Sequence, residues 1–180
     1  MQNRSVLKSN ATEMSEAHLA YLSLGSNIQP ETNLIKAIEL LQNHGKLEKI
    51  SNAWESESVG AEGPNYLNAC VLLVTPLAKP DLKKQALLPI ETGLGRQRSA
   101  NKFSPRTIDI DIVVFDGKSC DDKYWEQAFV VVPLAEIHPR YQNPITHETI
   151  TETATRLRRI EWLQTRPDVL GRFKGMAPET

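Results

Sequence analysis

Hydrophobic and polar positions along the chain follow two different periods. Between residues 18 and 24 they alternate, which is typical of a strand, whereas over 31–43 apolar residues recur every three or four positions, as on one face of a helix. The same patterns predict, in chain order, strands at 47–57 and 66–75, a helix from 81 to about 92 and a strand at 107–115. Pro89 is expected to kink or shorten the second helix, because proline lacks a backbone N–H.

This order, β-α-β-β-α-β, predicts an α+β fold with a ferredoxin-like core. After the last of these strands the pattern weakens, and the C-terminal additions are expected to be a short strand at 129–132 and a helix within 146–163. We expect a flexible polar tail at 1–17, a single domain over 18–165 and a frayed C-terminus at 166–180.

The composition is that of an ordinary globular protein, with 40% hydrophobic and 24% charged residues in a chain of 180. Lys and Arg number 21 against 22 Asp and Glu, so the formal net charge of -1 provides no general attraction to nucleic acid or to an anionic membrane. No stretch reaches the roughly 20 apolar residues of a membrane span, and residues 1–18 lack the apolar middle of a secretory signal. Cys70 and Cys120 lie too far apart for a metal-binding motif. We therefore expect a cytoplasmic monomer or small homo-oligomer whose partners are small molecules, not nucleic acid or membranes.

The strand at 107–115 carries two carboxylates, Asp109 and Asp111, that face the same side because side chains two apart in a strand point the same way. The opposite, core-facing side is expected to carry Ile108, Ile110, Ile112 and Val114. Adjacent carboxylates repel each other unless a positive charge lies between them, and Mg²⁺ typically binds one or two carboxylates together with substrate phosphates. The pattern favours a metal–polyphosphate site, although two aspartates on a solvated sheet face would give the same spacing.

Basic residues precede this strand in a glycine-containing stretch: Arg96, Arg98, Lys102 and Arg106. Arginine forms paired hydrogen bonds with phosphate, and lysine provides a point charge. Basic and acidic groups concentrated together in such a balanced chain indicate phosphate binding. Arg106 could equally be a structural partner of Asp109 or Asp111.

Five motifs together resemble the hydroxymethyldihydropterin pyrophosphokinases. The octet 105–112, PRTIDIDI, resembles the signature of that family. The other four are YLSLGSN at 21–27, YLNA at 66–69, Glu91 followed by GRQR at 95–98, and FVVVPLAEI at 129–137. They occur in the family's order over about 21–139, and the family's ferredoxin-like core agrees with the predicted element order.

The resemblance implies transfer of pyrophosphate from ATP to 6-hydroxymethyl-7,8-dihydropterin in folate biosynthesis, with release of AMP. Asp109 and Asp111 would hold two Mg²⁺ ions on the triphosphate. The nucleotide side would be bound by Glu91, Arg96, Arg98, Lys102, Phe103 and Arg106, of which Arg96, Arg98 and Arg106 would contact or close over the phosphates. The pterin would be bound by Ser58, Val59, Gly60, Tyr66, Asn68 and Phe129, with the two aromatic rings on either side of it.

Some of these residues have simpler explanations. From spacing alone Tyr66 and Phe129 are better explained as core residues, and Glu91 near a helix end as a solvated side chain. The segment 116–128 also departs from the family pattern, because it contains no histidine or arginine and Gln127 stands where an arginine is expected. Two alternatives therefore stay open: a weakened or non-catalytic relative that binds pterin or nucleotide, and a ferredoxin-like interaction or RNA-binding module.

Overall fold

The structure, a computed structural model, describes residues 17–58, 63–97 and 105–173. Its strands are β1 (His18–Ser26), β2 (Lys46–Ile50), β3 (Ala53–Ser56), β4 (Tyr66–Thr75), β5 (Asp109–Phe115), β6 (Lys118–Ser119) and β7 (Leu163–Arg166). Its helices are α1 (Pro30–Leu41), α2 (Lys79–Asp81), α3 (Leu88–Gly93), α4 (Ala128–Ile137), α5 (Ile150–Leu157) and α6 (Pro167–Leu170). Within the described ranges, no helix is long and apolar enough to cross a membrane.

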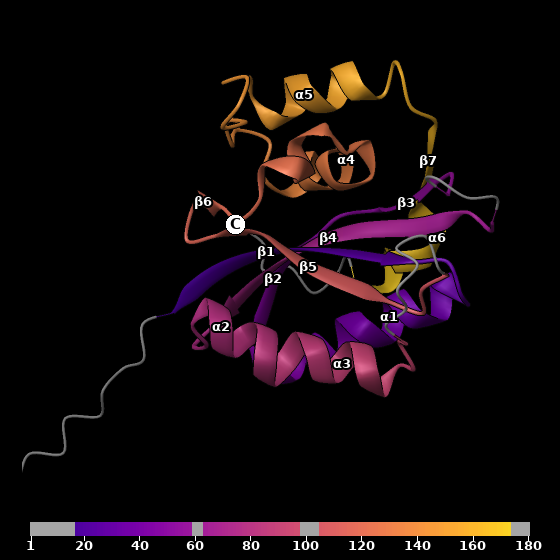
Figure 1. The fold of residues 1–180 in the computed structure, drawn as a ribbon, viewed down its shortest axis with the longest axis vertical. Coiled ribbons are helices and arrows are strands. Elements are labelled where there is room, and N and C mark those ends of the chain that lie inside the picture. The colour runs from indigo at the N-terminus through magenta and orange to yellow at the C-terminus, as the bar shows by residue number, and fades with distance from the viewer. Residues whose placement is uncertain (1–16, 59–62, 98–104, 174–180) are drawn as a thin grey trace, which may run out of the picture.

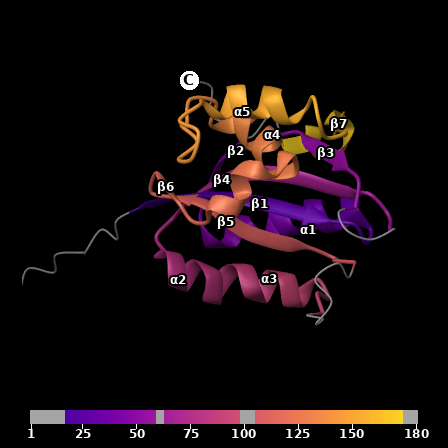
Figure 2. The ribbon, with the colours of Figure 1, turned by 45° about the horizontal axis from the view of Figure 1, so that its top comes forward.

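One antiparallel sheet separates two helical layers (Figure 1). The strand order is β6-β5-β1-β4-β3-β7, and β2 also pairs with β4. Helices α1, α2 and α3 lie on one face of the sheet, and α4 and α5 lie on the other (Figures 1 and 2). The α+β class expected from the sequence is confirmed, with the predicted second strand divided into β2 and β3.

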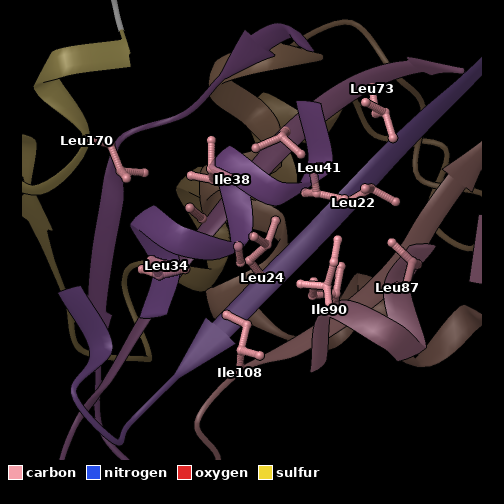
Figure 3. Packing of buried hydrophobic residues seen from close by; sticks show 14 of the residues in the cluster. Leu22, Leu24, Leu34, Ile38, Leu41, Leu73, Leu87, Ile90, Ile108 and Leu170 are labelled. Carbon is pink, nitrogen blue, oxygen red and sulfur yellow. The ribbon is translucent and has the colours of Figure 1, made fainter. Parts of the chain in front are cut away.

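The first core fills the space between the sheet and the layer of α1 and α3. It joins Leu22 and Leu24 of β1 to Leu34, Ile38 and Leu41 of α1, with Leu87, Ile90, Ile108 and Leu170 around them (Figure 3). Burying each such side chain contributes about 1.5–3 kcal/mol. This apolar layer supports the strands that carry the polar side chains of the opposite face.

The second core lies between the sheet and the helices α4 and α5. It contains a side chain of β5 that was expected on the opposite face of the strand. The pairing of β1 with β5 contains a bulge, because Tyr21 pairs with Val114 but Leu22 pairs with Ile112. The extra residue, Val113, shifts the alternation by one position, since side-chain facing in a strand has a period of two. Val114 was expected beside Ile112 in the first core, and it packs in the second core instead.

Pro89 does not shorten the second helix. The helix runs without interruption from Lys79 to Gly93, and its middle segment, Leu82–Leu87, is π-helical. The N–H of Leu88 donates to the carbonyl of Lys83, five residues earlier. The missing N–H of Pro89 therefore coincides with a local change in helix pitch, in which the backbone bonding pattern is already shifted.

The strand expected at 129–132 is wrong, because these residues belong to α4. Three successive valines favour a strand locally, but α4 is packed between the sheet and α5 and is buried on nearly every side. The expected helix within 146–163 is the shorter α5, which begins at a capping box between Thr149 and Glu152. The chain then returns to the sheet as β7.

Part of the segment expected to be frayed, 166–180, is helical and packs against the first core. Helix α6 is followed by a 3₁₀ turn, Gly171–Phe173, and Val169, Leu170 and Phe173 are buried. Arg166 fastens the start of this segment, because its guanidinium forms ion pairs with Glu31 at 2.7 Å and with Glu55 at 3.3 Å.

Candidate active site

The two aspartates of β5 lie on the sheet face that carries α4, at the end of the sheet not covered by that helix. Asp109 pairs with Gly25 of β1 and Asp111 pairs with Ser23. On the other side of β1, Gly25 pairs with Asn68 of β4. Side chains directly opposite each other in an antiparallel sheet share a face. The register therefore brings both carboxylates and the Asn68 amide to one surface.

This surface is the floor of a cavity of about 530 Å³. The cavity is lined by Ser23, Gly25, Ser56, Glu57, Tyr66, Asn68, Arg106, Asp109, Asp111, Lys123, Tyr124, Gln127, Phe129 and Val130. Six of the residues singled out from the sequence are thus brought together: Tyr66, Asn68, Arg106, Asp109, Asp111 and Phe129.

Asp109 is held between two guanidinium groups. Arg96 and Arg106 each donate to one of its carboxylate oxygens. Arg96 also pairs with Glu91 at 2.5 Å, and the same Glu91 oxygen accepts the backbone N–H of Ile110 at 2.9 Å. Burial raises the pKa of Glu91, whereas Asp109 and Glu91 raise the pKa of Arg96 against the opposing effect of burial. Glu91 is thus a buried group that joins α3 to β5, not a solvated one.

The turn after β1 positions Arg106. The Asn27 side-chain oxygen accepts the N–H of Arg106 at 2.7 Å, and the N–H of Asn27 donates to the Arg106 carbonyl at 3.0 Å. The Ser26 hydroxyl donates to the carbonyl of Thr107 at 2.5 Å. These bonds fix the backbone of Arg106 beside Asp109. The ion pair of Arg106 with Asp109 that the sequence left open is present.

Asp111 has different neighbours. It lies exposed in the cavity, with the hydroxyl of Tyr124 and the ammonium of Lys123 near enough to stabilise its negative charge. The surrounding protein raises the pKa of Asp111 by desolvation, and the negative charge of Asp109 adds to that effect. Burial, and then Asp111 itself, raises the pKa of Tyr124, so the phenol remains a donor.

An aromatic pair and an amide also line the cavity. Tyr66 and Phe129 are half-buried and line the cavity, so their rings are accessible and not enclosed in a core. Asn68 is buried, and its amide NH₂ donates to Ser56 Oγ at 2.9 Å and to the Trp54 carbonyl at 3.3 Å. A side chain at Gly25 would approach the Asn68 oxygen to 3.2 Å, so glycine leaves that oxygen room.

The donor set fits a hard divalent cation that is shared with a ligand. Within the described ranges, no three His, Cys, Asp or Glu side chains cluster in a way that could hold a metal by themselves. Two carboxylates on one strand face provide the small number of protein oxygens with which Mg²⁺ binds when phosphates complete its coordination. Asp109 and Asp111 therefore suit Mg²⁺ bound together with a polyphosphate.

Not every expected site residue can be assigned to the cavity. Val59, Gly60, Arg98, Lys102 and Phe103 are outside the described residues, and Ser58 does not line the cavity. Sequence analysis missed cavity residues of two kinds. Ser23 and Gly25 could have been found from their alternation in β1, since they pair with the aspartates. Tyr124 gave no periodic signal, because it lies in a short 3₁₀ helix, Asp122–Glu126.

The family model described as 7,8-dihydro-6-hydroxymethylpterin-pyrophosphokinase (HPPK) matches residues 21–139 of the chain. A Synechocystis protein named 2-amino-4-hydroxy-6-hydroxymethyldihydropteridine pyrophosphokinase is 37% identical over 153 residues, which cover 76% of this chain and 75% of that protein. The Bacillus subtilis protein of the same name is 32% identical over 152 residues and is covered to 90%.

Solved structures show that the fold of this chain is similar to that of HPPK-containing proteins. The chain superposes on Plasmodium falciparum HPPK-DHPS, solved with STZ-DHP, with a TM-score of 0.62 at 14% identity. The match covers 81% of this chain and 42% of the Plasmodium chain, so this chain spans less than half of that larger protein. An Arabidopsis thaliana protein named folate synthesis bifunctional protein is 32% identical, and the match covers 26% of its length.

Proposed function

The chain belongs to the 7,8-dihydro-6-hydroxymethylpterin-pyrophosphokinase family, and we propose that it takes the pyrophosphoryl group from ATP and releases AMP. It is an enzyme of folate biosynthesis, a transferase of diphosphate groups. The observation that carries the proposal is a single cavity that is lined both by carboxylates and arginine and by an aromatic pair with an amide. The charged groups suit a metal-bound triphosphate, and the aromatic pair suits a flat pterin ring.

Tyr66 and Phe129 hold the pterin between their rings. Stacking of this kind contributes about 0.5–1.5 kcal/mol beyond the burial of area. Because the amide NH₂ of Asn68 is already bonded to Ser56 and Trp54, the side chain keeps one orientation, and its oxygen accepts from the pterin edge. The role assigned to the backbone at 58–60 remains a prediction.

Asp109 and Asp111 would hold Mg²⁺, with two ions as the number we propose. When bound there, the metal would offset phosphate charge and help to align the triphosphate. Arg96 and Arg106, which bind Asp109 in the ligand-free protein, exchange that carboxylate for phosphate oxygens. Arg98, Lys102 and Phe103 stay predicted contacts on this side, and Glu91 acts by holding Arg96.

The chemistry requires positioning more than covalent help. The hydroxymethyl oxygen of the pterin forms a bond to the β-phosphorus of ATP, the bond from that phosphorus to the α,β-bridging oxygen breaks, and AMP leaves with the electron pair. The hydroxyl proton passes to solvent. The residues of the chain align the two ligands and offset the charge that shifts to AMP, which is how proteins catalyse phosphoryl transfer.

We also infer that the core is the ferredoxin-like β-α-β-β-α-β unit. The order β5-β1-β4 with β2 and β3 beside β4, all antiparallel, supports it. Further support comes from α1 and the helix at 79–93, which cover one face of the sheet (Figure 2).

The test is an assay of the products formed from ATP, Mg²⁺ and reduced 6-hydroxymethylpterin. We expect one AMP for each pterin consumed and none without pterin, and formation of ADP in its place would contradict the proposal. Titration of the pterin with α,β-methylene-ATP present, and of the analogue itself, measures pterin binding and nucleotide binding separately. Phe129→Ala is expected to weaken pterin binding roughly threefold to tenfold while leaving nucleotide binding unchanged. An unchanged pterin affinity would place the ring elsewhere.

A further inference from the structure

One cationic side chain of the cavity, that of Lys123, has no assigned part in ligand binding. Among the described residues that line the cavity, the positively charged ones are Arg106 and Lys123. Arg106 is bound to Asp109, whereas Lys123 stands on the Asp111 side and attracts that carboxylate. The two cations therefore lie beside different aspartates.

The backbone beneath Lys123 is firmly held. The Asp121 side chain caps the 3₁₀ segment by accepting the N–H of Lys123 at 3.1 Å. Two residues further on, Trp125 is buried, and its ring N–H donates to Ser119 Oγ at 3.0 Å. Between them, Tyr124 is buried, and its side chain lines the cavity near Asp111. The position from which the lysine side chain extends is therefore defined.

The ammonium group itself is only weakly engaged. It pairs with Asp121 at 3.0 Å, and the side chains of Lys123 and Asp121 are 57% and 43% exposed. It also lies 4.9 Å from the centre of the Tyr124 ring. Exposed ion pairs contribute little to stability, and a lysine on its flexible stem can change partners without disturbing the fold. An anion in the cavity is a stronger partner than a solvated carboxylate outside it.

We propose that Lys123 is a nucleotide-binding residue that contacts the triphosphate on the Asp111 side, opposite Arg106. This inference rests on the proposed function, because it requires a polyphosphate at the two aspartates. Gln127, which follows in the same wall of the cavity, is neutral. Lys123 thus provides the positive charge that this wall otherwise lacks within the described residues.

The experiment compares Lys123→Gln with Lys118→Gln. Both lysines belong to the segment between β5 and α4, but Lys118 does not line the cavity. Calorimetric titration with Mg²⁺ and α,β-methylene-ATP measures nucleotide binding without turnover. We expect Lys123→Gln to weaken it about tenfold, Lys123→Arg to retain most of it, and Lys118→Gln to match the wild type. Pterin affinity is expected to stay constant in all three variants.

Equal affinities in Lys123→Gln and Lys118→Gln would overturn the inference, and so would a loss confined to pterin binding. The design separates this result from the proposed function, which product analysis tests on the wild type. A wild type that binds nucleotide but forms no AMP would contradict pyrophosphoryl transfer from ATP and still allow the binding comparison. A wild type that does not bind the nucleotide analogue would overturn both.

Discussion

Asp109 and Asp111 stand two residues apart on one face of one strand, yet their surroundings differ. Asp109 is bound by Arg96 and Arg106, so its charge is neutralised before any ligand arrives. Asp111 has the hydroxyl of Tyr124 near it, and none of the ion pairs among the described residues involves it. The arginine side of the cavity is thus assembled around its carboxylate, whereas the tyrosine side leaves its carboxylate exposed.

The difference indicates a division of work between the two carboxylates. Metal binding at Asp109 requires two guanidiniums to change partners, and those guanidiniums then become available to phosphate. Among the described residues Asp111 forms no ion pair, so a metal bound there would displace none and would offset the repulsion from Asp109. We infer that Asp111 provides the accessible ligand and Asp109 links metal binding to the arginines.

The largest expected effect is the loss of turnover when either carboxylate is neutralised. Asp109→Asn and Asp111→Asn are each expected to lower the rate of AMP formation roughly 100- to 1000-fold, since each removes charge that organises the triphosphate. Asp122→Asn is the matched control, because Asp122 lies in the nearby 3₁₀ segment but does not line the cavity. A rate within tenfold of the wild type in either cavity variant would exclude that residue as a metal ligand.

The two substitutions are expected to have different effects on the melting temperature, although both lower activity. Asp109→Asn leaves Arg96 without one of its carboxylates in a place where both side chains are less than one-fifth exposed, at 16% and 17%. Loss of such a partner is expected to cost about 2 kcal/mol, which lowers the melting temperature by roughly 4–8 °C. Asp111→Asn is expected to melt at or above the wild-type temperature. Equal destabilisation by both substitutions would remove the contrast.

The gain in Asp111→Asn is expected to depend on pH. Because the folded state raises the pKa of Asp111 above its unfolded value, ionisation costs stability, and that cost grows as pH rises from about 4 through the folded pKa. The asparagine variant carries no such cost. Its melting temperature, measured from pH 4 to pH 7, is therefore expected to exceed that of the wild type increasingly toward neutral pH. A difference in melting temperature that does not change with pH would show that ionisation of Asp111 is not its cause.

Sequence patterns predicted one half of this comparison well. The alternation in 107–115 was sufficient to place both aspartates on one face, and the basic stretch before it supplies Arg96 and Arg106. Partners of the second aspartate could not be predicted in the same way. Tyr124 comes from a short 3₁₀ segment, and side chains there are positioned by Trp125 and Asp121, which is a tertiary effect without a period along the chain.

Two of the errors in the fold have a similar cause. The valines of α4 carry strong strand propensity, but burial between the sheet and α5 decides their conformation. In β5 the bulge at Val113 moves Val114 to the other face, and a bulge gives no signal in a run of apolar residues. Local preference was reliable where one face of an element meets solvent, and it failed where both faces are buried.

Tyr124→Phe tests the tyrosine side of the cavity and is expected to have a smaller effect than the aspartate substitutions. The substitution removes the hydroxyl near Asp111 and retains the ring, so the carboxylate loses a polar neighbour but not its charge. We expect the Mg²⁺ concentration for half-maximal binding of α,β-methylene-ATP to rise roughly threefold to tenfold. Tyr141→Phe is the control, since Tyr141 stacks on Trp125 at 5.4 Å and does not line the cavity. Identical Mg²⁺ dependence in both variants would show that Tyr124 only packs.

The smallest expected effect comes from giving the tyrosine side a guanidinium of its own. The backbone at Gln127 is held by its N–H bond to the Tyr124 carbonyl at 3.2 Å, and its extended conformation suits arginine, so Gln127→Arg changes the cavity wall and little else. Charge-assisted hydrogen bonds are about twice as strong as neutral ones, and we expect a severalfold lower KM for ATP. Gln127→Met is the control for side-chain volume.

The gain from Gln127→Arg is expected to be larger in a Lys123→Gln background, because the added charge then replaces a missing one and neighbouring sites are not additive. If Gln127→Arg improves neither background, the Asp111 side of the cavity does not limit nucleotide binding, and the asymmetry between the two aspartates has no consequence for ATP.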